Sequence, residues 1–275
     1  MQVNISVIVP AKEPTYLPHL LYCLSRQSER TSEVIIVCKG QETMESAVML
    51  SQKYRIASVL IEQKAGYFTH ALNLGKDAAT GDIIVFTDSD AMPPRNWISN
   101  YSKLFAKMPK SIAGISSRDF YYNMLTRRKV QAKDDLLRMK LYRLLVRTWL
   151  QPPIALLKKY RFGVYLTRSL DYVQGPFLPH RYCCSLPYRG ANMGFRRESI
   201  DGISFPEDVN LVAAPGNEQY LGLRLVLNGF DLVYVPFNYV WHVDRPSLSR
   251  GITESQLARE ITIMKRAYLE ALEDA

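Results

Sequence analysis

The chain has 275 residues, of which 47% are hydrophobic and 22% charged, and its formal net charge is +9. These values are typical of a globular protein with a substantial core, and they exclude a disordered chain. Between Arg127 and Arg168 there are twelve Lys and Arg residues against only Asp134 and Asp135. This segment alone carries +10, so the remainder is nearly neutral, unlike a uniformly basic nucleic-acid-binding protein.

The four cysteines have no paired CxxC spacing, and the adjacent Cys183 and Cys184 are poorly placed to begin a disulfide framework. This usage favours a reducing compartment. No basic region followed by a long apolar core opens the chain, so no signal peptide is expected. No uncharged apolar stretch reaches 18 residues, so no membrane span is expected. Together these features predict a cytoplasmic protein.

Short apolar runs alternate with amphipathic segments over the first 90 residues. Strands are expected at 3–10, 33–37, 58–62 and 83–86, and helices at 16–27, 44–54 and 66–79. Alternating strands and helices predict an α/β protein with a doubly wound, mainly parallel sheet. The loop after the first strand, AKEPTY, has no glycine, which argues against a dinucleotide-binding fold of the GxGxxG kind.

The remaining elements follow from the same periodicity. A helix is expected at 97–108 and a strand at 111–116, followed by a basic helix at 134–150 and a short apolar and basic stretch at 154–160. A helix at 217–227, a strand at 231–235 and a terminal helix at 253–272 complete the chain. The terminal helix is expected to pack on its own domain, and the oligomeric state stays open.

Two carboxylates follow the buried run Ile83–Phe86, in the sequence Asp88-Ser89-Asp90. In an open parallel sheet, ligands bind just beyond the carboxyl ends of the strands. Carboxylate oxygens at this point predict a site for a divalent cation. The alternative is a solvated turn, because Asp and Ser are common turn residues.

Five segments in order resemble glycosyltransferase family 2, whose members are inverting enzymes of the GT-A fold. They are SVIVPAKE (Ser6–Glu13), EVIIVCKG (Glu33–Gly40), ALNLGKDAATGDIIVFTDSD (Ala71–Asp90), RGANMGFRRE (Arg189–Glu198) and NEQYLGLRLVLNGFDLVYVP (Asn217–Pro236). The resemblance covers residues 3–245, apart from the basic block at 119–185. It implies a single GT-A domain with a mainly parallel, Rossmann-like central sheet flanked by helices, plus a basic helical insertion. Its parts would be a nucleotide-binding half (1–117), the insertion (118–187), an acceptor and catalytic half (188–245) and a C-terminal helix (246–275).

The resemblance also implies a metal site and a catalytic base. Asp90 would bind Mn²⁺ or Mg²⁺, Asp88 would lie by the ribose and the metal's waters, and His242 would add a metal or phosphate contact. The family usually has Glu-Asp before L-G-L-R, with the Asp as base, where this chain has Asn217-Glu218. Glu218 is therefore the expected base for the acceptor hydroxyl. The alternatives are a packed His242, an Asn217 helix cap and a Glu218 that only favours the helix dipole.

Substrate-binding residues are implied in the same way. The donor-binding residues would be Pro10, Ala11, Glu13, Cys38, Asn73, Asp88 and Ser89, and the acceptor-binding residues Gly190, Ala191 and Asn192. Cys38 stands where the family commonly has an Asp that bonds uracil, and a thiol is a weak acceptor. A UDP-sugar is the expected partner, with GDP- and dTDP-sugars left open. Glu13 and Leu72 also replace the usual Asn and Arg, changes that an inactive member would share.

The basic segment has two interpretations. It is either a helical cover on the sheet with solvated charges, or a basic amphipathic surface lying on anionic lipid. The second predicts a peripheral protein at the inner face of the cell membrane and a lipid-linked or otherwise anionic acceptor.

The sequence therefore predicts a metal-dependent, inverting glycosyltransferase that uses a nucleotide sugar. A sugar nucleotidyltransferase is disfavoured because AKEPT lacks a glycine-rich phosphate loop. A non-catalytic carbohydrate- or lipid-surface-binding protein on the same fold stays an alternative, since fold does not fix function. Nucleic-acid binding is not expected, because the basic segment has no recognised motif and the aromatic residues are dispersed.

Overall fold

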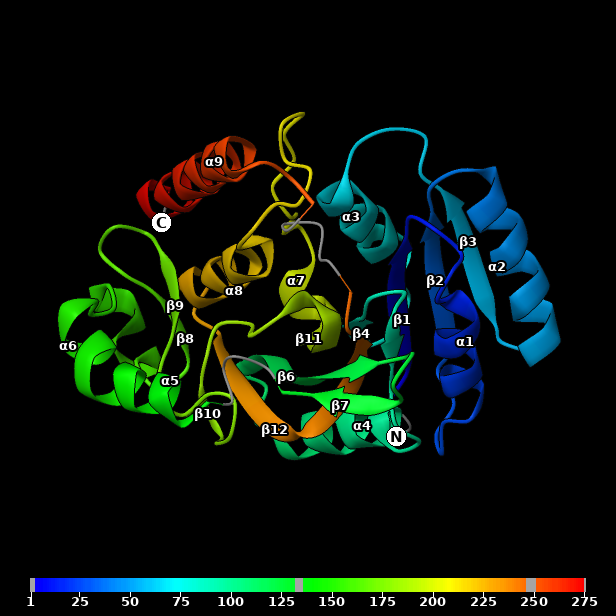
Figure 1. Cartoon of the computed structure of the whole chain (residues 1–275), viewed down its shortest axis with the longest axis horizontal. Helices are drawn as coiled ribbons and strands as arrows, with labels where there is room; N and C mark the ends of the chain where they lie inside the picture. Colours follow the sequence, from blue (N-terminus) through cyan, green and yellow to red (C-terminus); the bar gives the residue numbers. More distant parts are fainter. Residues whose placement is uncertain (1–2, 132–135, 246–250, 275) are drawn as a thin grey trace.

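The computed structural model describes residues 3–131, 136–245 and 251–274 as an α/β domain (Figure 1). Its first half alternates strands and helices as predicted. These are β1 (Ile5–Ala11), α1 (Leu17–Ser25), β2 (Glu33–Cys38), α2 (Gln41–Tyr54), β3 (Ser58–Glu62), α3 (Phe68–Ala78) and β4 (Ile83–Phe86). Strands β3 and β4 have the predicted bounds, and the other elements differ from the prediction by a few residues at their ends.

The second half completes the sheet with longer strands than predicted. Its main elements are β5 (Ala91–Met92), α4 (Trp97–Lys107), β6 (Ile112–Asn123), β7 (Arg128–Val130), β11 (Met193–Arg196), α7 (Arg197–Ile200), α8 (Asn217–Leu227), β12 (Asp231–Val243) and α9 (Glu254–Glu273). Strand β6 crosses the predicted boundary at residue 117, so the nucleotide-binding half and the insertion share a strand. Helix α8 has the predicted bounds.

The main sheet has the order β10-β12-β6-β11-β4-β1-β2-β3, in which β10 is the short strand Cys183–Cys184. Strands β4, β1, β2 and β3 pair in parallel, and so do β6 and β12. Strand β11 lies between β4 and β6 and is antiparallel to both. The mainly parallel sheet of the prediction is confirmed, and β11 joins its two parallel parts. The short strands β5, β7 and β10 are also antiparallel to their neighbours.

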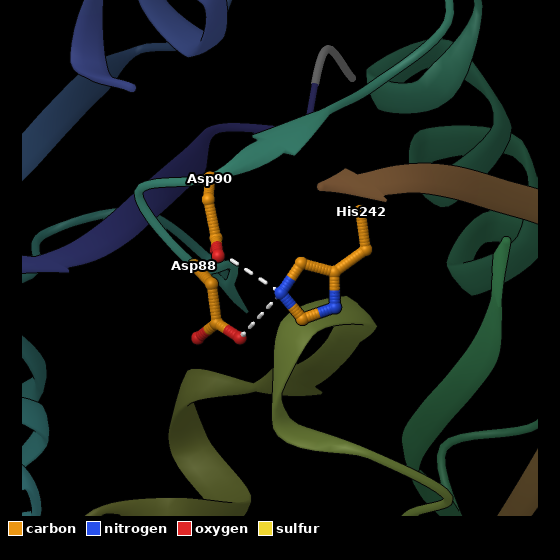
Figure 2. Close-up of side chains that lie close together, drawn as sticks. All are labelled: Asp88, Asp90 and His242. Atoms are coloured by element: carbon orange, nitrogen blue, oxygen red, sulfur yellow. Dashed lines mark hydrogen bonds and ion pairs between the residues drawn. The ribbon is translucent and has the colours of Figure 1, made fainter. Parts of the chain in front are cut away.

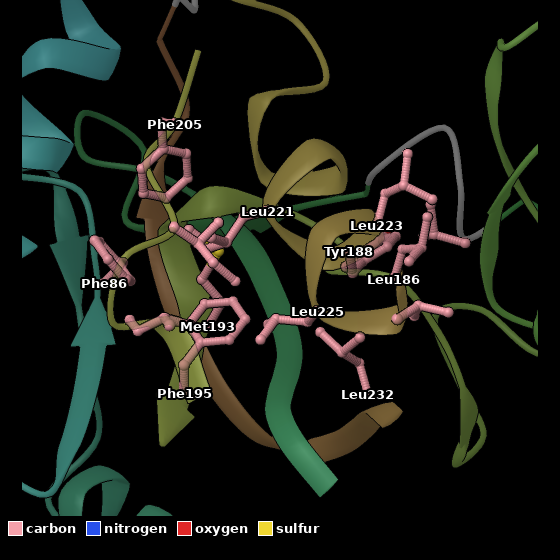
Figure 3. Packing of buried hydrophobic residues seen from close by; sticks show 14 of the residues in the cluster. Phe86, Leu186, Tyr188, Met193, Phe195, Phe205, Leu221, Leu223, Leu225 and Leu232 are labelled. Atoms are coloured by element: carbon pink, nitrogen blue, oxygen red, sulfur yellow. The ribbon is translucent and has the colours of Figure 1, made fainter. Parts of the chain in front are cut away.

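Apolar layers cover both faces of this sheet, because successive side chains of a strand point to opposite faces. On one face, Val7 and Val9 pack in a cluster with residues of α1, α2 and α4. On the other face, Ile8 and Phe86 belong to a cluster that includes residues of α3, α8 and α9. Figure 3 shows part of this second cluster, in which leucines of α8 lie over the sheet. The carboxyl end of β4 is thereby fixed between two packed layers.

The basic insertion is only partly helical. The predicted helix at 134–150 consists of α5 (Leu137–Tyr142), a π-helical turn (Arg143–Arg147) and α6 (Thr148–Leu150), and residues 132–135 lie outside the described part. The stretch that follows comprises a 3-10 helix (Ala155–Tyr160), a hairpin of β8 (Val164–Leu166) and β9 (Tyr172–Gln174), and β10 (Cys183–Cys184). Sequence periodicity missed these short strands because three residues are too few to show an alternation.

Helix α9 packs against α8, as predicted for the terminal helix. The hydroxyl of Tyr268 donates to the carbonyl of Gly216, at 2.7 Å, just before α8 begins. Within the described residues, no helix combines the length and apolar character needed to cross a membrane.

Candidate active site

The two carboxylates after β4 are brought to His242 by strand pairing. The chain turns directly after Asp88, where the amide of Ala91 donates to the carbonyl of Asp88 at 3.0 Å. Ala91 and Met92 then form β5, which pairs antiparallel with β12 so that His242 lies opposite Ala91. A residue far along the chain is thus fixed beside the Asp88-Ser89-Asp90 turn.

Asp88, Asp90 and His242 form one cluster (Figure 2). The Nε2 atom of His242 lies 3.0 Å from Oδ1 of Asp90 and 3.7 Å from Oδ2 of Asp88. One potential ligand atom from each residue lies within 4.8 Å of the others. Two carboxylate oxygens and an imidazole nitrogen form a donor set that suits a divalent cation such as Mn²⁺.

A second charged pair, Asp119 and Arg189, lies on the Nδ1 side of the His242 ring. Asp119, in β6, is buried, and its Oδ2 lies 3.6 Å from Nδ1 of His242 and 2.8 Å from Nη1 of Arg189. Tyr121 stacks on the His242 ring, with 5.8 Å between the ring centroids. Burial alone would raise the pKa of Asp119, but the Arg189 charge and His242 hold it well below its usual value. Asp119 is therefore a charged second layer that orients the imidazole.

The charges in the cluster shift its pKa values in opposite directions. Burial raises the pKa of Asp88 to about 6. Burial would lower the pKa of His242, but the nearby carboxylates of Asp119 and Asp90 raise it to about 10. For Asp90, burial is outweighed by His242 and Arg245, which lower its pKa. Of the two carboxylates after β4, Asp90 therefore has the lower pKa and is the more fully ionised.

Arg245 links the cluster of Asp88, Asp90 and His242 to the loop after β1. Its Nε lies 2.5 Å from Oδ2 of Asp90, and its Nη1 contacts the carboxylate of Glu13. Tyr16 lies under the guanidinium, 5.1 Å from ring centroid to Cζ. Glu13, predicted to bind the donor, therefore lies at the same site as Asp90 but is paired with a cation.

Glu218 lies in the first turn of α8, close enough to Asp88 for that charge to act on it. Burial raises its pKa to about 7, and the nearby charge of Asp88 adds to this effect. The helix begins after Gly216, whose φ of +95° favours glycine. A Cβ at this position would also lie 2.3 Å from the hydroxyl of Tyr268. The backbone that presents Glu218 is thus fixed by a residue that cannot be replaced without strain.

A protein-family model described as Glycosyl transferase family 2 matches residues 6–167, more than half of the chain. The chain belongs to glycosyltransferase family 2. A comparison with curated protein sequences found no match.

Solved glycosyltransferase structures share the fold of this family-2 protein. The mannosyltransferase PcManGT from Pyrobaculum calidifontis, in complex with GDP-Man and Mn²⁺, superposes with a TM-score of 0.60 at 17% identity over 100% of this chain and 75% of its own. TarS 1–349 of S. aureus, in complex with UDP-GlcNAc, gives 0.59 at 15% identity over 95% and 66%. GalNAc-T7, with UDP, GalNAc and Mn²⁺, gives 0.65 at 14% identity over 89% and 44%. The family-2 chain therefore has the GT-A fold but spans only part of each of these proteins.

Several residues predicted to bind substrates have their polar atoms in contacts within the protein. Cys38 is fully buried, with its thiol directed to the carbonyl of Ile36, so it offers no surface to a nucleotide base. Asn73 bonds the backbone of Phe205 through both ends of its amide and also donates to Glu207. For both, the polar atoms are already used within the protein.

Asn192, predicted to bind the acceptor, is likewise a buried hydrogen-bond centre. Its Oδ1 accepts from Trp97 and Tyr101, and its Nδ2 donates to the carbonyls of Arg118 and Asn238. It ties α4, β6 and β12 together beneath the site. These bonds position the three elements, and contact of Asn192 with the acceptor stays a prediction.

For the other predicted residues, the internal contacts neither support nor oppose a role in substrate binding. Ala191 accepts from the Thr87 hydroxyl at 2.9 Å, which ties the Gly190 turn to the end of β4. Gly190 has open space where a Cβ would lie. Pro10 and Ala11 end β1, and Ser89 is buried in the turn between the two carboxylates. Asn217 does not cap α8, because its side chain donates backward to the carbonyl of Ala214.

Three charged residues of the site were not predicted. Asp119 and Arg189 lie 70 residues apart, so no local spacing links them, although an Asp and an Arg inside strand-like surroundings are a weak signal of a buried pair. Arg245 follows His242 by three residues, a nearness that could have drawn attention to it. Each was missed because its role depends on the tertiary pairing of β5, β6 and β12.

A cavity of about 490 Å³ opens beside Lys39, which follows β2. Its walls are Lys39, residues 65–67, Thr69, His70 and residues 207–209. Glu207 is held there by His70, 2.9 Å away, and by Asn73. The volume is within the range of small-molecule sites.

Proposed function

We propose that this protein is an inverting, metal-dependent glycosyltransferase that moves a sugar from a nucleoside diphosphate to an acceptor hydroxyl. The observation that carries the proposal is the cluster of Asp88, Asp90 and His242 at the carboxyl end of β4, near Glu218 in the first turn of α8. Its family membership supports glycosyl transfer as the reaction class.

Asp88, Asp90 and His242 would hold the divalent metal. The fit rests on their donor atoms, two hard carboxylate oxygens and one imidazole nitrogen within 4.8 Å of one another. Binding would require loss of the His242 proton, as is usual for metal ligation by histidine. When bound, Mn²⁺ or Mg²⁺ neutralises the charge that develops on the diphosphate. Asp119 would keep the imidazole oriented toward the ion through Nδ1.

Glu218 is proposed as the base. It would accept the proton of the acceptor hydroxyl while that oxygen bonds the anomeric carbon and the bond from this carbon to the diphosphate breaks. The electron pair of that bond leaves with the nucleoside diphosphate. A base with a pKa near 7 suits this task at neutral pH, because about half of it is ionised and it still accepts a proton readily. A single base acting on the far side from the leaving group gives inversion.

The cavity beside Lys39 is proposed to take the nucleoside. It is walled by segments near the ends of β2 and β3, where α/β sheets bind ligands. Since Cys38 is buried, its side chain does not contact the nucleotide base. A UDP-, GDP- or dTDP-sugar is therefore compatible with the site. The solved structures with bound UDP-GlcNAc or GDP-Man belong to proteins of the same fold, which supports a nucleotide sugar as the partner.

The test is thermal stability with UDP, GDP, dTDP and CMP, each with and without Mn²⁺, followed by transfer from the sugar nucleotide whose diphosphate binds. A ligand at 100 times its dissociation constant adds about 2.7 kcal/mol of stability. We expect one diphosphate to raise the melting temperature only with Mn²⁺, and Asp90→Ala to lose this shift. Asp201→Ala, at an exposed position, is the matched control. Binding without hydrolysis or transfer would favour a non-catalytic protein, and no shift with any nucleotide would count against the proposal.

A further inference from the structure

The segment Leu137–Leu150 has its apolar side chains on the outside. Leu137, Leu141, Leu144, Leu145, Trp149 and Leu150 are between 47% and 82% exposed. Several of them follow one another at spacings of three or four residues, so they form a stripe along the helical segment. Helices on the surface of globular proteins normally turn such a stripe toward the core. This segment therefore has the opposite orientation to the one expected of a helical cover.

A buried arginine fixes that orientation. Arg143 is 1% exposed, and its guanidinium donates to the carbonyl of Leu178 at 3.2 Å and to Oε1 of Gln174 at 2.5 Å. If the segment rotated to bury its leucines, both hydrogen bonds of Arg143 would break. The apolar stripe would then face the core where Arg143 now lies. The exposed apolar stripe is thus specified by the structure beneath it. Arg143 belongs to the fold and not to any charged outer surface.

The charge around the stripe identifies what covers it. Between Asp135 and Asp171 the sequence has no acidic residue. Arg138 is exposed within Leu137–Leu150, and Lys158, Arg161 and Arg168 are exposed in the stretch that follows it. Leucines with an exposed Trp and flanking Lys and Arg are the composition of helices that lie in the interface of an anionic bilayer. A protein partner of ordinary surface composition would not require this one-sided charge.

We propose that Leu137–Leu150 docks the protein on the surface of an anionic lipid bilayer. The stripe enters the boundary between headgroups and acyl chains, and the basic residues contact lipid phosphates. Figure 1 shows α5 and α6 at one end of the molecule, with α1 and α2 at the other, so this end is free to meet a flat surface.

The docking segment is linked to the proposed base by a short strand. Gln174, which holds Arg143, ends β9, and Tyr172 begins it. Tyr172 lies against Gly216, two residues before Glu218, since a Cβ at Gly216 would be 3.2 Å from the Tyr172 ring. If the proposed function holds, on which this step rests, the acceptor hydroxyl is carried by a lipid that reaches Glu218 from the docked surface.

The test is co-sedimentation of the full chain with vesicles of phosphatidylglycerol and phosphatidylcholine, and with phosphatidylcholine alone. We expect binding to the anionic vesicles only. The double variant L145Q/W149Q should weaken this binding at least tenfold. The variant R138E/K158E should weaken it at low salt. The matched control is V48Q/M49Q, which replaces exposed apolar residues of α2 at the other end of the molecule. Quenching of Trp149 fluorescence by brominated lipid would place the stripe within the bilayer.

Equal sedimentation of wild type and L145Q/W149Q would overturn the proposal, provided that the two proteins have the same circular dichroism spectrum. A stable dimer that L145Q/W149Q dissociates, without vesicle binding, would also overturn it, since a second copy would then cover the stripe. Because vesicle binding is measured without substrate, and donor hydrolysis without vesicles, failure of the docking surface and failure of the glycosyltransferase activity are separate results.

Discussion

The Nε atom of Arg245 lies 2.5 Å from Oδ2 of Asp90, whose other oxygen, Oδ1, lies 3.0 Å from His242. Both oxygens of the proposed metal ligand are thus engaged by cationic side chains. Arg245 also contacts Glu13, so the guanidinium bridges the loop after β1 and the turn after β4. The same carboxylate has to serve the metal and this bridge.

Arg245 is therefore expected to compete with the metal. Replacing it with Gln removes a positive charge from Asp90, so Mn²⁺ should bind the nucleotide-free protein about fivefold more tightly, which corresponds to about 1 kcal/mol for a partly exposed pair. Isothermal titration with Mn²⁺ measures this change. Arg26→Gln makes the same change in net charge at an exposed site and should leave the affinity unchanged. Weaker Mn²⁺ binding by Arg245→Gln would show that the guanidinium supports the metal site.

The second prediction concerns the pH dependence of transfer. Glu218 has a pKa of about 7 and must be ionised to accept a proton, so kcat/KM should rise about tenfold per pH unit below 7 and level off above it. Steady-state kinetics between pH 5 and 9 give this profile. Glu218→Gln should lack activity at every pH, whereas Glu198→Gln, at an exposed position, should keep both rate and profile. A flat profile for the wild type would assign the base to another residue.

The same group predicts a gain in stability. Burial raises the folded-state pKa of Glu218 above its unfolded value, so the group favours the folded state below its unfolded pKa and loses that contribution as pH rises through 7. Glu218→Gln removes the buried charge and should stabilise the protein by about 2 kcal/mol at pH 8, allowing for partial exposure, and by little at pH 5. Urea unfolding at the two pH values tests this. A larger gain at pH 5 than at pH 8 would contradict it.

Much of the fold could be predicted because its signals are local. The apolar runs of β1 to β4 predicted a parallel sheet, and Asp88 and Asp90 were found because they directly follow β4. The later parts of β6 and β12 lie beyond the predicted strands at 111–116 and 231–235, because their strand structure depends on pairing with each other. The internal bonds of polar residues in the family motifs could not be predicted either. Asn73 and Asn192 point inward and bond the backbone, which the sequence alone cannot distinguish from ligand contacts.

The basic segment shows the same limit. Its periodicity predicted an amphipathic helix, but which side faces the protein depends on what lies beneath it. The carbonyl of Leu178 and the side chain of Gln174 accept hydrogen bonds from Arg143, and this contact turns the leucines outward. These partners lie more than 30 residues further along the chain, in elements that the sequence did not predict.

The last prediction concerns Glu260, which is fully buried in α9. Its carboxylate accepts hydrogen bonds from the amides of Val212, Ala213 and Ala214, at 2.8–3.2 Å, in the loop that leads into α8. Glu260→Gln keeps the volume but removes the charge and one acceptor, so it should lower the free energy of unfolding by about 2 kcal/mol.

Because this loop presents Glu218, the same variant should also lower kcat for transfer. Glu270→Gln, at an exposed position of the same helix, is the control and should change neither quantity. Urea unfolding and steady-state kinetics measure the two effects. If Glu260→Gln lost stability but kept its full kcat, the carboxylate would anchor α9 without positioning the base, and the placement of Glu218 would depend on Gly216 and Tyr268 alone.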